Sequence, residues 1–486
     1  MGTIGIDLGT SSLKAILVDG QQRVVAGTTR ALTVHRPQPL WSEQEPGDWV
    51  AAALGALHDL REAAPAAFRL CRGIGLSGQM HGAVLLDEAD RPLRPCILWN
   101  DGRASAECAE LEAAEPASRA ITGNIAMPGF TAPKLLWVRR HEPGLFRRIR
   151  KVLLPKAYLR LVLTGEAIEE MSDASGTLWL DVGSRDWSQR MLAATGLDRS
   201  QMPALVEGSQ PAGRMRGDLA RELGFDSPPL FAGGAGDNAA GAVGLGAVTA
   251  GSSFLSLGTS GVLWRTTAGF EPRADRAVHA FCHALPGLWH QMSVHLSAAA
   301  SLNWWANLVG GTEVELLAAL GEMVTAPSLA LFTPYLSGER TPHNDPQMRG
   351  GFARLGHETG RNAMTQAVLE GVAFAFRDGK AALESAGGPI TEAVVIGGGA
   401  RSGLWLSILA SVLDMRLHRY PQAETGAAFG AARLARLACT GENPAEICTQ
   451  PLGSPEIFNP QRELVAAYRE RYDDWQSAAE FSRAMH

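Results

Sequence analysis

Short apolar runs alternate with turn-forming residues at the start of the chain. Residues 4–6, 15–18 and 23–26 are apolar stretches of strand length, and Asp19-Gly20 between the last two is a typical hairpin turn. We therefore expect three short strands that form an antiparallel meander. A further apolar run at 73–76 predicts a return to strand.

Two longer segments have helical periodicity instead. After Pro46, apolar residues recur at spacings of three and four, which predicts an amphipathic helix; they are Trp49, Ala53, Leu57 and Leu60. Residues 364–386 predict a long helix, in the core or between domains, with its apolar side formed by Val368, Val372, Ala375, Phe376 and Leu383.

Residues 394–396 read as a strand that opens into Gly397, Gly398 and Gly399 and then a helix, a geometry that suits a nucleotide.

The tetrapeptide Leu-Gly-Thr-Ser occurs at residues 8–11 and again at 257–260, each time between apolar runs. This repeat, half a chain apart, suggests two related lobes, each with a strand, a turn and a strand. Glycine and hydroxyl residues in such a turn can hold a phosphate without lysine, although two ordinary hairpin turns are the alternative. Asp7 has Ser256 as its counterpart, so only the first turn offers a carboxylate to a cation such as Mg²⁺.

Length and charge restrict the class of protein. A chain of 486 residues predicts two domains of about 240 residues each. The net charge is −6 and the basic residues are scattered, which argues against a nucleic-acid partner. None of the five lysines stands in a Walker A context.

The location of the protein can be predicted from the same composition. Asp7 interrupts the apolar N-terminus, so we expect no secretory signal. The weakly polar stretch 230–264 contains Asp237 and many glycines, which does not favour a membrane span. Six cysteines without Cys-x-x-Cys spacing fit a reducing cytoplasm.

Asp237 is the most informative carboxylate. It is the only charged residue in the small-residue stretch 233–241 and follows an apolar run, so we expect it at a strand end near a ligand, where a general base can be held firmly. The structural alternative, Asp237 as the N-cap of a helix over 238–246, is compatible with that role.

Two polar clusters in the first half are candidates for a polyol site. Gln79, Met80 and His81 stand between glycines after the strand at 73–76, and the segment 98–103 combines Trp99, Asn100, Asp101 and Arg103. Directional polar groups beside an aromatic wall are a common way to bind a polyol. The alternative is a structural His81 and a surface ion pair between Asp101 and Arg103.

A zinc site at His279-x-x-x-His283 is not favoured. The spacing matches a zinc helix, but the glutamate of the zinc-protease motif is missing and Pro286-Gly287 breaks any helix soon afterwards.

Together these features resemble the FGGY carbohydrate kinases. The resemblance rests on the two turns, the Asp237 loop, the glycine run at 397–399 and the segment 129–138, which matches the family's signature. It covers nearly the whole chain and weakens after about Cys439. At 77–83, 98–103, 121–141 and 334–343 the chain is most similar to members that act on D-xylulose. The loop Gln79-Met80-His81 differs from the arginine-containing loop of glycerol-type members.

The resemblance implies an α/β fold of the actin-like ATPase type. We expect two ribonuclease H-like domains with ATP in the cleft between them. Residues 1–245 would hold the sugar and the base, and residues 246–486, including a helical tail, would hold ATP.

The resemblance also implies roles for single residues. Asp237 would be the general base, and Asp7 the carboxylate for metal and phosphate. The sugar would contact Met80, His81, Trp99, Asp101 and Asn238. ATP would contact Gly9, Thr10 and Ser11 in the first turn, Gly258 and Thr259 in the second, and Gly397, Gly398 and Gly399.

The expected activity is ATP- and Mg²⁺-dependent phosphorylation of D-xylulose, with another ketose or a polyol as alternative acceptor. An actin-like chaperone or filament ATPase needs no sugar pocket, and the presence of both Asp7 and Asp237 disfavours a sugar sensor without activity. A homodimer is left open.

Overall fold

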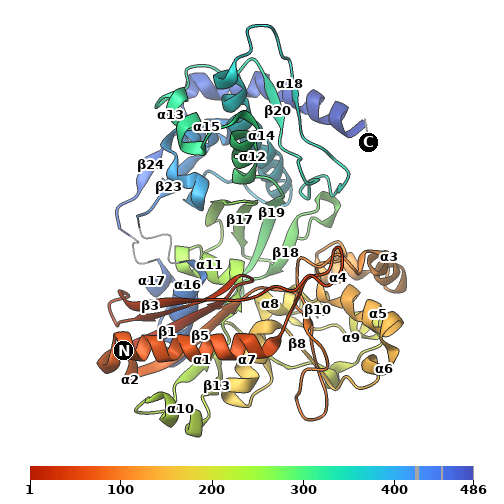
Figure 1. The fold of residues 1–486 in the computed structure, drawn as a ribbon, viewed down its shortest axis with the longest axis vertical. Coiled ribbons are helices and arrows are strands. Elements are labelled where there is room, and N and C mark those ends of the chain that lie inside the picture. Colours follow the sequence, from red (N-terminus) through yellow and green to blue (C-terminus); the bar gives the residue numbers. More distant parts are fainter. Residues whose placement is uncertain (422–425, 450–452, 485–486) are drawn as a thin grey trace.

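The computed structural model describes residues 1–421, 426–449 and 453–484. Figure 1 shows two lobes, one above the other, each built around its own sheet. Each sheet has seven strands, in the order β13-β14-β5-β1-β2-β3 with β15 beside β5 in the first, and β18-β19-β17-β16-β22-β23-β24 in the second. We call the parts built on these sheets the first lobe and the second lobe.

The strands of the first sheet are β1 (Gly2–Leu8), β2 (Ser12–Val18), β3 (Val24–Ala31), β5 (Cys71–Gly78), β13 (Pro211–Arg214), β14 (Leu230–Ala232) and β15 (Ala235–Gly236). Those of the second are β16 (Ser253–Leu257), β17 (Gly261–Thr267), β18 (His279–Cys282), β19 (Trp289–His295), β22 (Glu392–Ile396), β23 (Arg416–Arg419) and β24 (Glu456–Phe458). Five two-stranded sheets pair β4 (Glu43–Gln44) with β7 (Cys96–Ile97), β6 (Val84–Leu86) with β8 (Lys151–Leu153), β9 (Ile168–Glu170) with β12 (Ala204–Val206), β10 (Leu180–Asp181) with β11 (Asp186–Trp187), and β20 (Leu331–Thr333) with β21 (Gly351–Ala353).

The helices that precede the second sheet are α1 (Pro46–Ala63), α2 (Pro65–Arg69), α3 (Ser105–Ala114), α4 (Ser118–Thr122), α5 (Thr131–His141), α6 (Pro143–Phe146), α7 (Pro155–Thr164), α8 (Met171–Ser175), α9 (Gln189–Thr195), α10 (Gly217–Leu223) and α11 (Asp237–Leu245). The later helices are α12 (Ala299–Val309), α13 (Glu313–Leu320), α14 (Arg361–Glu384), α15 (Gly403–Leu413), α16 (Gly426–Thr440), α17 (Pro444–Cys448) and α18 (Arg462–Ala484). Short 3₁₀ turns cover Arg199–Gln201, Ala274–Arg276 and Gly398–Arg401.

The two sheets share one topology, as the repeated tetrapeptide predicts. In each, the first strand has an antiparallel neighbour on one side and a parallel neighbour on the other: β1 pairs with β2 and β5, and β16 pairs with β17 and β22. A further antiparallel strand follows in each sheet, with β3 beside β2 and β19 beside β17. The predicted α/β fold with two related domains is therefore confirmed. The loop after β5 in the first lobe and the glycine run after β22 in the second occupy equivalent positions.

Most of the predicted elements are confirmed with small shifts. The N-terminal meander is present as β1, β2 and β3. Helix α1 buries Trp49, Ala53, Leu57 and Leu60 completely, and α14 lies in the core of the second lobe. The glycine run does not lead directly into a helix, because a 3₁₀ turn follows Gly397 and α15 begins only after Ser402 caps it.

Helix α16 returns from the second half of the chain to the first sheet. It packs on β1 and β5 of that sheet (Figure 1). Close approach requires glycine here, because a Cβ on Gly5 would lie 1.8 Å from the Ala428 carbonyl oxygen and one on Gly75 would lie 1.8 Å from that of Ala431. The segment α16–α17 thus packs on the first lobe although it follows β23 in sequence.

The interior is apolar in both lobes, with one cluster under α1, one around α14 and one that extends from α5 to α11 and α16. All six cysteines are free thiols. Among the described residues, we find no helix with the length and apolar character that crossing a bilayer requires.

Candidate functional site

The carboxyl ends of β1, β5 and β15 meet at one edge of the first sheet. Register aligns Asp7 of β1 with Ser77 of β5, and Ala235 of β15 also pairs with Ser77. The loops that follow these strands carry the first turn, the segment Gln79 to His81, and Asp237. Parallel pairing therefore brings together three segments that are far apart in sequence.

Asp237 is the first residue of α11, and Gly236 is the N-cap. The alternative of Asp237 as the cap is therefore wrong. Its Oδ1 accepts hydrogen bonds from the backbone N and Nδ2 of Asn238, at 2.7 and 3.0 Å. Among the residues described, none donates a hydrogen bond to Oδ2, so this oxygen is available to a ligand.

The surroundings of Asp237 raise its basicity. Burial and the neighbouring Asp7 carboxylate raise the pKa of Asp237 from 3.8 to about 6, against the opposing bonds from Asn238. A carboxylate with this pKa is mostly ionised at pH 7 and is a better proton acceptor than an ordinary aspartate.

Asp7 is fixed by its own strand neighbours. Its Oδ1 accepts a hydrogen bond of 2.9 Å from Ser77 Oγ. Burial raises the pKa of Asp7, while Ser77 and Lys14 act against the rise. A carboxylate at this position, beside a phosphate-type turn, is chemically suited to a hard cation.

A hydrogen-bonded network holds the first turn. Gly9 N donates to Ser12 O at 3.0 Å and closes the turn. The Thr10 hydroxyl donates to Gln79 Oε1 at 3.0 Å and accepts from Trp99 Nε1 at 2.9 Å. Gln44 Nε2 donates to Thr10 O at 2.7 Å. Ser11, next in the turn, is exposed. The turn is thereby tied to both polar clusters that the sequence singled out.

His81 has a defined tautomer. Its backbone lies in the left-handed region, with φ 70°, and its Nδ1 lies 2.8 Å from the Gly176 carbonyl, so Nδ1 is the donor. Burial, with smaller contributions from Lys134 and Arg340, lowers the pKa of His81 to about 3. The ring is therefore neutral, and Nε2 is a hydrogen-bond acceptor.

A cavity of about 330 Å³, here called the cleft pocket, collects these groups. The predicted sugar residues that line it are Met80, His81, Trp99, Asn238 and Asp237 itself. The second half of the chain contributes residues that sequence reasoning did not assign, namely Ser256, Ser260, Val262, His279, Phe281, Met292, Val294 and Arg340. His279 lies on strand β18, and only its proximity in the fold, not a motif, reveals its position here.

Asp101 does not line the cleft pocket in this conformation. Its carboxylate accepts from Arg103 Nη2 at 2.7 Å and from the backbone N of Ser42 at 2.6 Å. The side chains of Asp101 and Arg103 are 0% and 1% exposed. The alternative of a surface ion pair is therefore corrected to a buried one, which fixes the loop that carries Trp99.

The second turn borders a larger cavity of about 850 Å³, here called the glycine cavity. Gly258, Thr259, Gly398 and Gly399 line it, together with residues of α12 and α13. Gly397 lines a neighbouring hollow instead, and its φ of 96° explains why glycine is needed there. The glycine cavity is large enough for a nucleotide.

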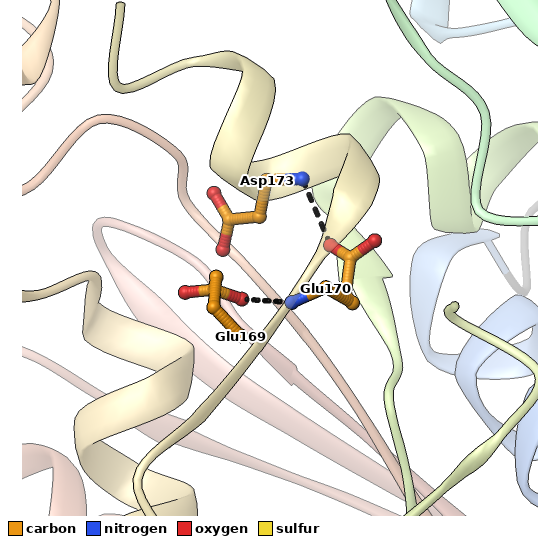
Figure 2. Close-up of side chains that lie close together, drawn as sticks. All are labelled: Glu169, Glu170 and Asp173. Atoms are coloured by element: carbon orange, nitrogen blue, oxygen red, sulfur yellow. Dashed lines mark hydrogen bonds between the residues drawn. The ribbon is translucent and has the colours of Figure 1, made fainter. Parts of the chain in front are cut away.

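Three buried carboxylates, Glu169, Glu170 and Asp173, lie close together where β9 leads into α8 (Figure 2). Glu169, Glu170 and Asp173 are the only described carboxylates, histidines or cysteines that converge as a metal cluster would, but Lys156 already pairs with all three. Glu170 accepts from the backbone N of Asp173 at 2.8 Å and so caps α8. We read the group as structural.

Two residues next to this group support the loop that carries Asp237. Arg160 donates to the carbonyl oxygens of Ala232 and Gly233. The hydroxyl of Ser172 accepts from Gly236 N at 3.1 Å. The residues immediately before Asp237 are thus held from behind by buried polar groups.

Fold and site together define a two-lobed phosphotransferase of the actin-like class. The chain belongs to the FGGY family of carbohydrate kinases: the family's N-terminal domain matches residues 3–244 and its C-terminal domain matches residues 254–439. The chain is 50% identical to the xylulose kinase of Escherichia coli (strain K12) over 475 residues, 96% of each chain.

Two solved structures are similar over the whole chain. A xyloylose kinase from Brucella ovis has 53% sequence identity and a TM-score of 0.98, with 100% of both chains covered. A xylulose kinase from Rhodospirillum rubrum has 28% identity and a TM-score of 0.92, with 100% of this chain and 99% of the other covered.

Proposed function

We propose that the chain transfers the γ-phosphoryl group of ATP to D-xylulose and releases D-xylulose 5-phosphate and ADP. The observation that carries this proposal is the position of Asp237, which lies in the cleft pocket among groups that can hold a polyol and beside a phosphate-type turn. The substrate assignment is supported by the names of the relatives, which include xylulose kinases at 50% identity.

In the proposed reaction, Oδ2 of Asp237 accepts the proton of the sugar's C5 hydroxyl as its oxygen attacks the γ-phosphorus. A new bond forms between this oxygen and phosphorus, and the bond from phosphorus to the β,γ-bridging oxygen breaks, so that ADP leaves. The Asn238 bonds to Oδ1 keep the carboxylate oriented. His81 Nε2 can accept a hydrogen bond from a sugar hydroxyl, and Trp99 covers an apolar face.

The two turns would bind the phosphates. Gly9, Thr10 and Ser11 approach from the first lobe, and Gly258 and Thr259 from the second, with Gly397, Gly398 and Gly399 beside the adenosine. Mg²⁺, when bound, would neutralise charge on the transferred group. Asp7 is suited to hold it, because it directly precedes the first turn and its carboxylate interacts electrostatically with that of Asp237.

Residues 1–245 would form the sugar and base domain, and residues 246–486 the ATP domain, although α16 and α17 of the second range pack on the first lobe. The cleft pocket also takes residues from the second part, so the sugar is bound between the two. We place the enzyme in the cytoplasm, where ATP is supplied and free thiols persist. The proposal includes a homodimer, which a measurement of the molecular mass in solution would test.

A coupled assay of ADP release tests the activity. The full chain should turn over with D-xylulose, ATP and Mg²⁺ well above its rate without sugar, and ³¹P NMR should show the phosphate on C5. D-ribulose, glycerol and D-gluconate serve as comparison acceptors. A higher kcat/KM with any of these than with D-xylulose would contradict the substrate assignment.

A further inference from the structure

Arg340 places a positive charge in the wall of the cleft pocket. It follows β20 in the second lobe, is half-buried and lines the pocket with His81 and Asp237. No carboxylate of the described residues forms an ion pair with its guanidinium. The adjacent Glu339 is engaged elsewhere, because Oε1 accepts from Leu296 N at 3.0 Å and Oε2 lies 3.4 Å from His295 Nδ1.

One arm of the guanidinium is anchored by a neutral histidine. Nη1 of Arg340 lies 3.2 Å from His279 Nε2, and His279 Nδ1 lies 2.8 Å from Asn124 Oδ1. Asn124 Nδ2 donates to the carbonyls of Thr122 and Ala280, so Oδ1 is its acceptor end and His279 Nδ1 carries the proton. His279 Nε2 therefore accepts from Arg340. No other acceptor among the described residues takes a hydrogen bond from this guanidinium, so its remaining N–H groups are available to a ligand.

The charge of Arg340 acts on the two histidines of the cleft pocket. The positive charge of Arg340 contributes to the lowered pKa values of His81 and His279. The groups that act on the pKa of Asp237 are Asp7 and Asn238. The pocket thus has a proton acceptor beside Asp7 and a donor-only cation on the His81 side.

We propose that Arg340 is a specificity-determining residue that donates hydrogen bonds to the keto oxygen at C2 of the sugar. This inference rests on the proposed function, in which the C5 hydroxyl lies at Asp237 and the C1–C2 end therefore points away from it. A ketone oxygen only accepts hydrogen bonds and a guanidinium only donates them, so the two match completely. The hydroxyl of the corresponding alditol would also carry a proton that Arg340 cannot accept.

The test compares the ketose with its reduced form in Arg340→Lys and Arg340→Gln. The KM for D-xylulose should rise about 30-fold or more in Arg340→Gln. It should rise less in Arg340→Lys, which keeps the positive charge but not the planar arrangement of several N–H donors. The inhibition constant of xylitol, measured in competition with D-xylulose, should change less than about threefold. Sugar-independent ATP hydrolysis and the KM for ATP should stay at wild-type values.

Arg276→Gln, at an exposed position in a 3₁₀ turn, is the matched control and should leave every value unchanged. Equal weakening of the binding of D-xylulose and of xylitol would overturn the proposal, because Arg340 would then not distinguish the C2 carbonyl from a hydroxyl. So would a wild-type enzyme that binds xylitol as tightly as D-xylulose, a comparison that needs no variant. If the wild type does not phosphorylate D-xylulose at all, the proposed function itself fails.

Discussion

The indole Nε1 of Trp99 donates a hydrogen bond of 2.9 Å to the hydroxyl of Thr10. One residue lines the cleft pocket and the other belongs to the first turn. The same Thr10 hydroxyl donates to Gln79 Oε1, next to Met80 and His81. The groups proposed to hold the sugar are therefore linked directly to those proposed to hold the phosphates.

Trp99→Phe should impair both substrates at once. The substitution keeps an aromatic wall but removes the donor to Thr10, so we expect the KM values for D-xylulose and ATP each to rise, by about 3- to 10-fold. Steady-state kinetics with each substrate varied in turn measures this. A change confined to the sugar KM would show that the bond to Thr10 has no part in nucleotide binding.

Asp7→Asn should change the metal requirement. The amide keeps the shape and can still accept a hydrogen bond from Ser77, but it loses the charge that attracts a cation. We expect the Mg²⁺ concentration for half-maximal rate to rise by about tenfold or more. An unchanged Mg²⁺ titration would mean that Asp7 serves only the turn.

The rate should fall in mild acid. The pKa of Asp237 is raised to about 6, and the base works only when ionised, so kcat/KM should drop about tenfold per pH unit below that value. Asp7→Asn removes the neighbouring negative charge and should move this fall to lower pH. A pH–rate profile flat down to pH 4.5 would contradict the assignment of the base.

The same pKa also affects stability. Because the folded state holds the Asp237 proton more tightly than the unfolded state, the ionised carboxylate destabilises the fold above pH 6, and this cost disappears as the pH falls toward 4. Asp237→Asn should therefore raise the thermal midpoint at pH 8 and have little effect near pH 4. An equal effect at both pH values would show that the charge is not its cause.

Asp101→Asn should act mainly through stability. Its carboxylate is buried against Arg103, whose guanidinium also pairs with Glu43 at 2.8 Å and lies 3.6 Å from the Trp41 ring centroid. Weakening one side of a buried pair costs about 3 kcal/mol. Thermal unfolding should show a lower midpoint. A wild-type midpoint with a raised KM for D-xylulose would instead support the direct sugar contact that the sequence predicts.

Local patterns were sufficient to predict the lobes and their turns. Alternating apolar runs located β1 and β2, the spacing of Trp49 and Leu57 located α1, and the repeated tetrapeptide located equivalent turns in two sheets of one topology. These features depend on residues close in sequence, so the sequence carries them directly.

The features that the sequence did not reveal depend on long-range packing. Nothing in residues 426–440 indicates that α16 returns to the first sheet. The only related signal is the pair of strand glycines Gly5 and Gly75, which leave room for the backbone of α16. Arg340 stands in a segment similar to the family, but its approach to His279 follows from the fold. The environment of Asp101 likewise depends on Ser42 and Arg103. The residues next to Asp101 in the sequence could not distinguish a buried ion pair with Arg103 from an exposed one.

The role of Asp237 as the general base is tested most directly by single-turnover kinetics of Asp237→Ala with D-xylulose and Mg-ATP. The rate of phosphoryl transfer should fall by about 100- to 10,000-fold, while ATP affinity, measured by calorimetry, stays within about threefold of the wild type. Asp237→Asn should lose as much, because the amide keeps the shape but cannot take the proton. A transfer rate within a few-fold of the wild type in a folded variant would show that Asp237 is not the general base.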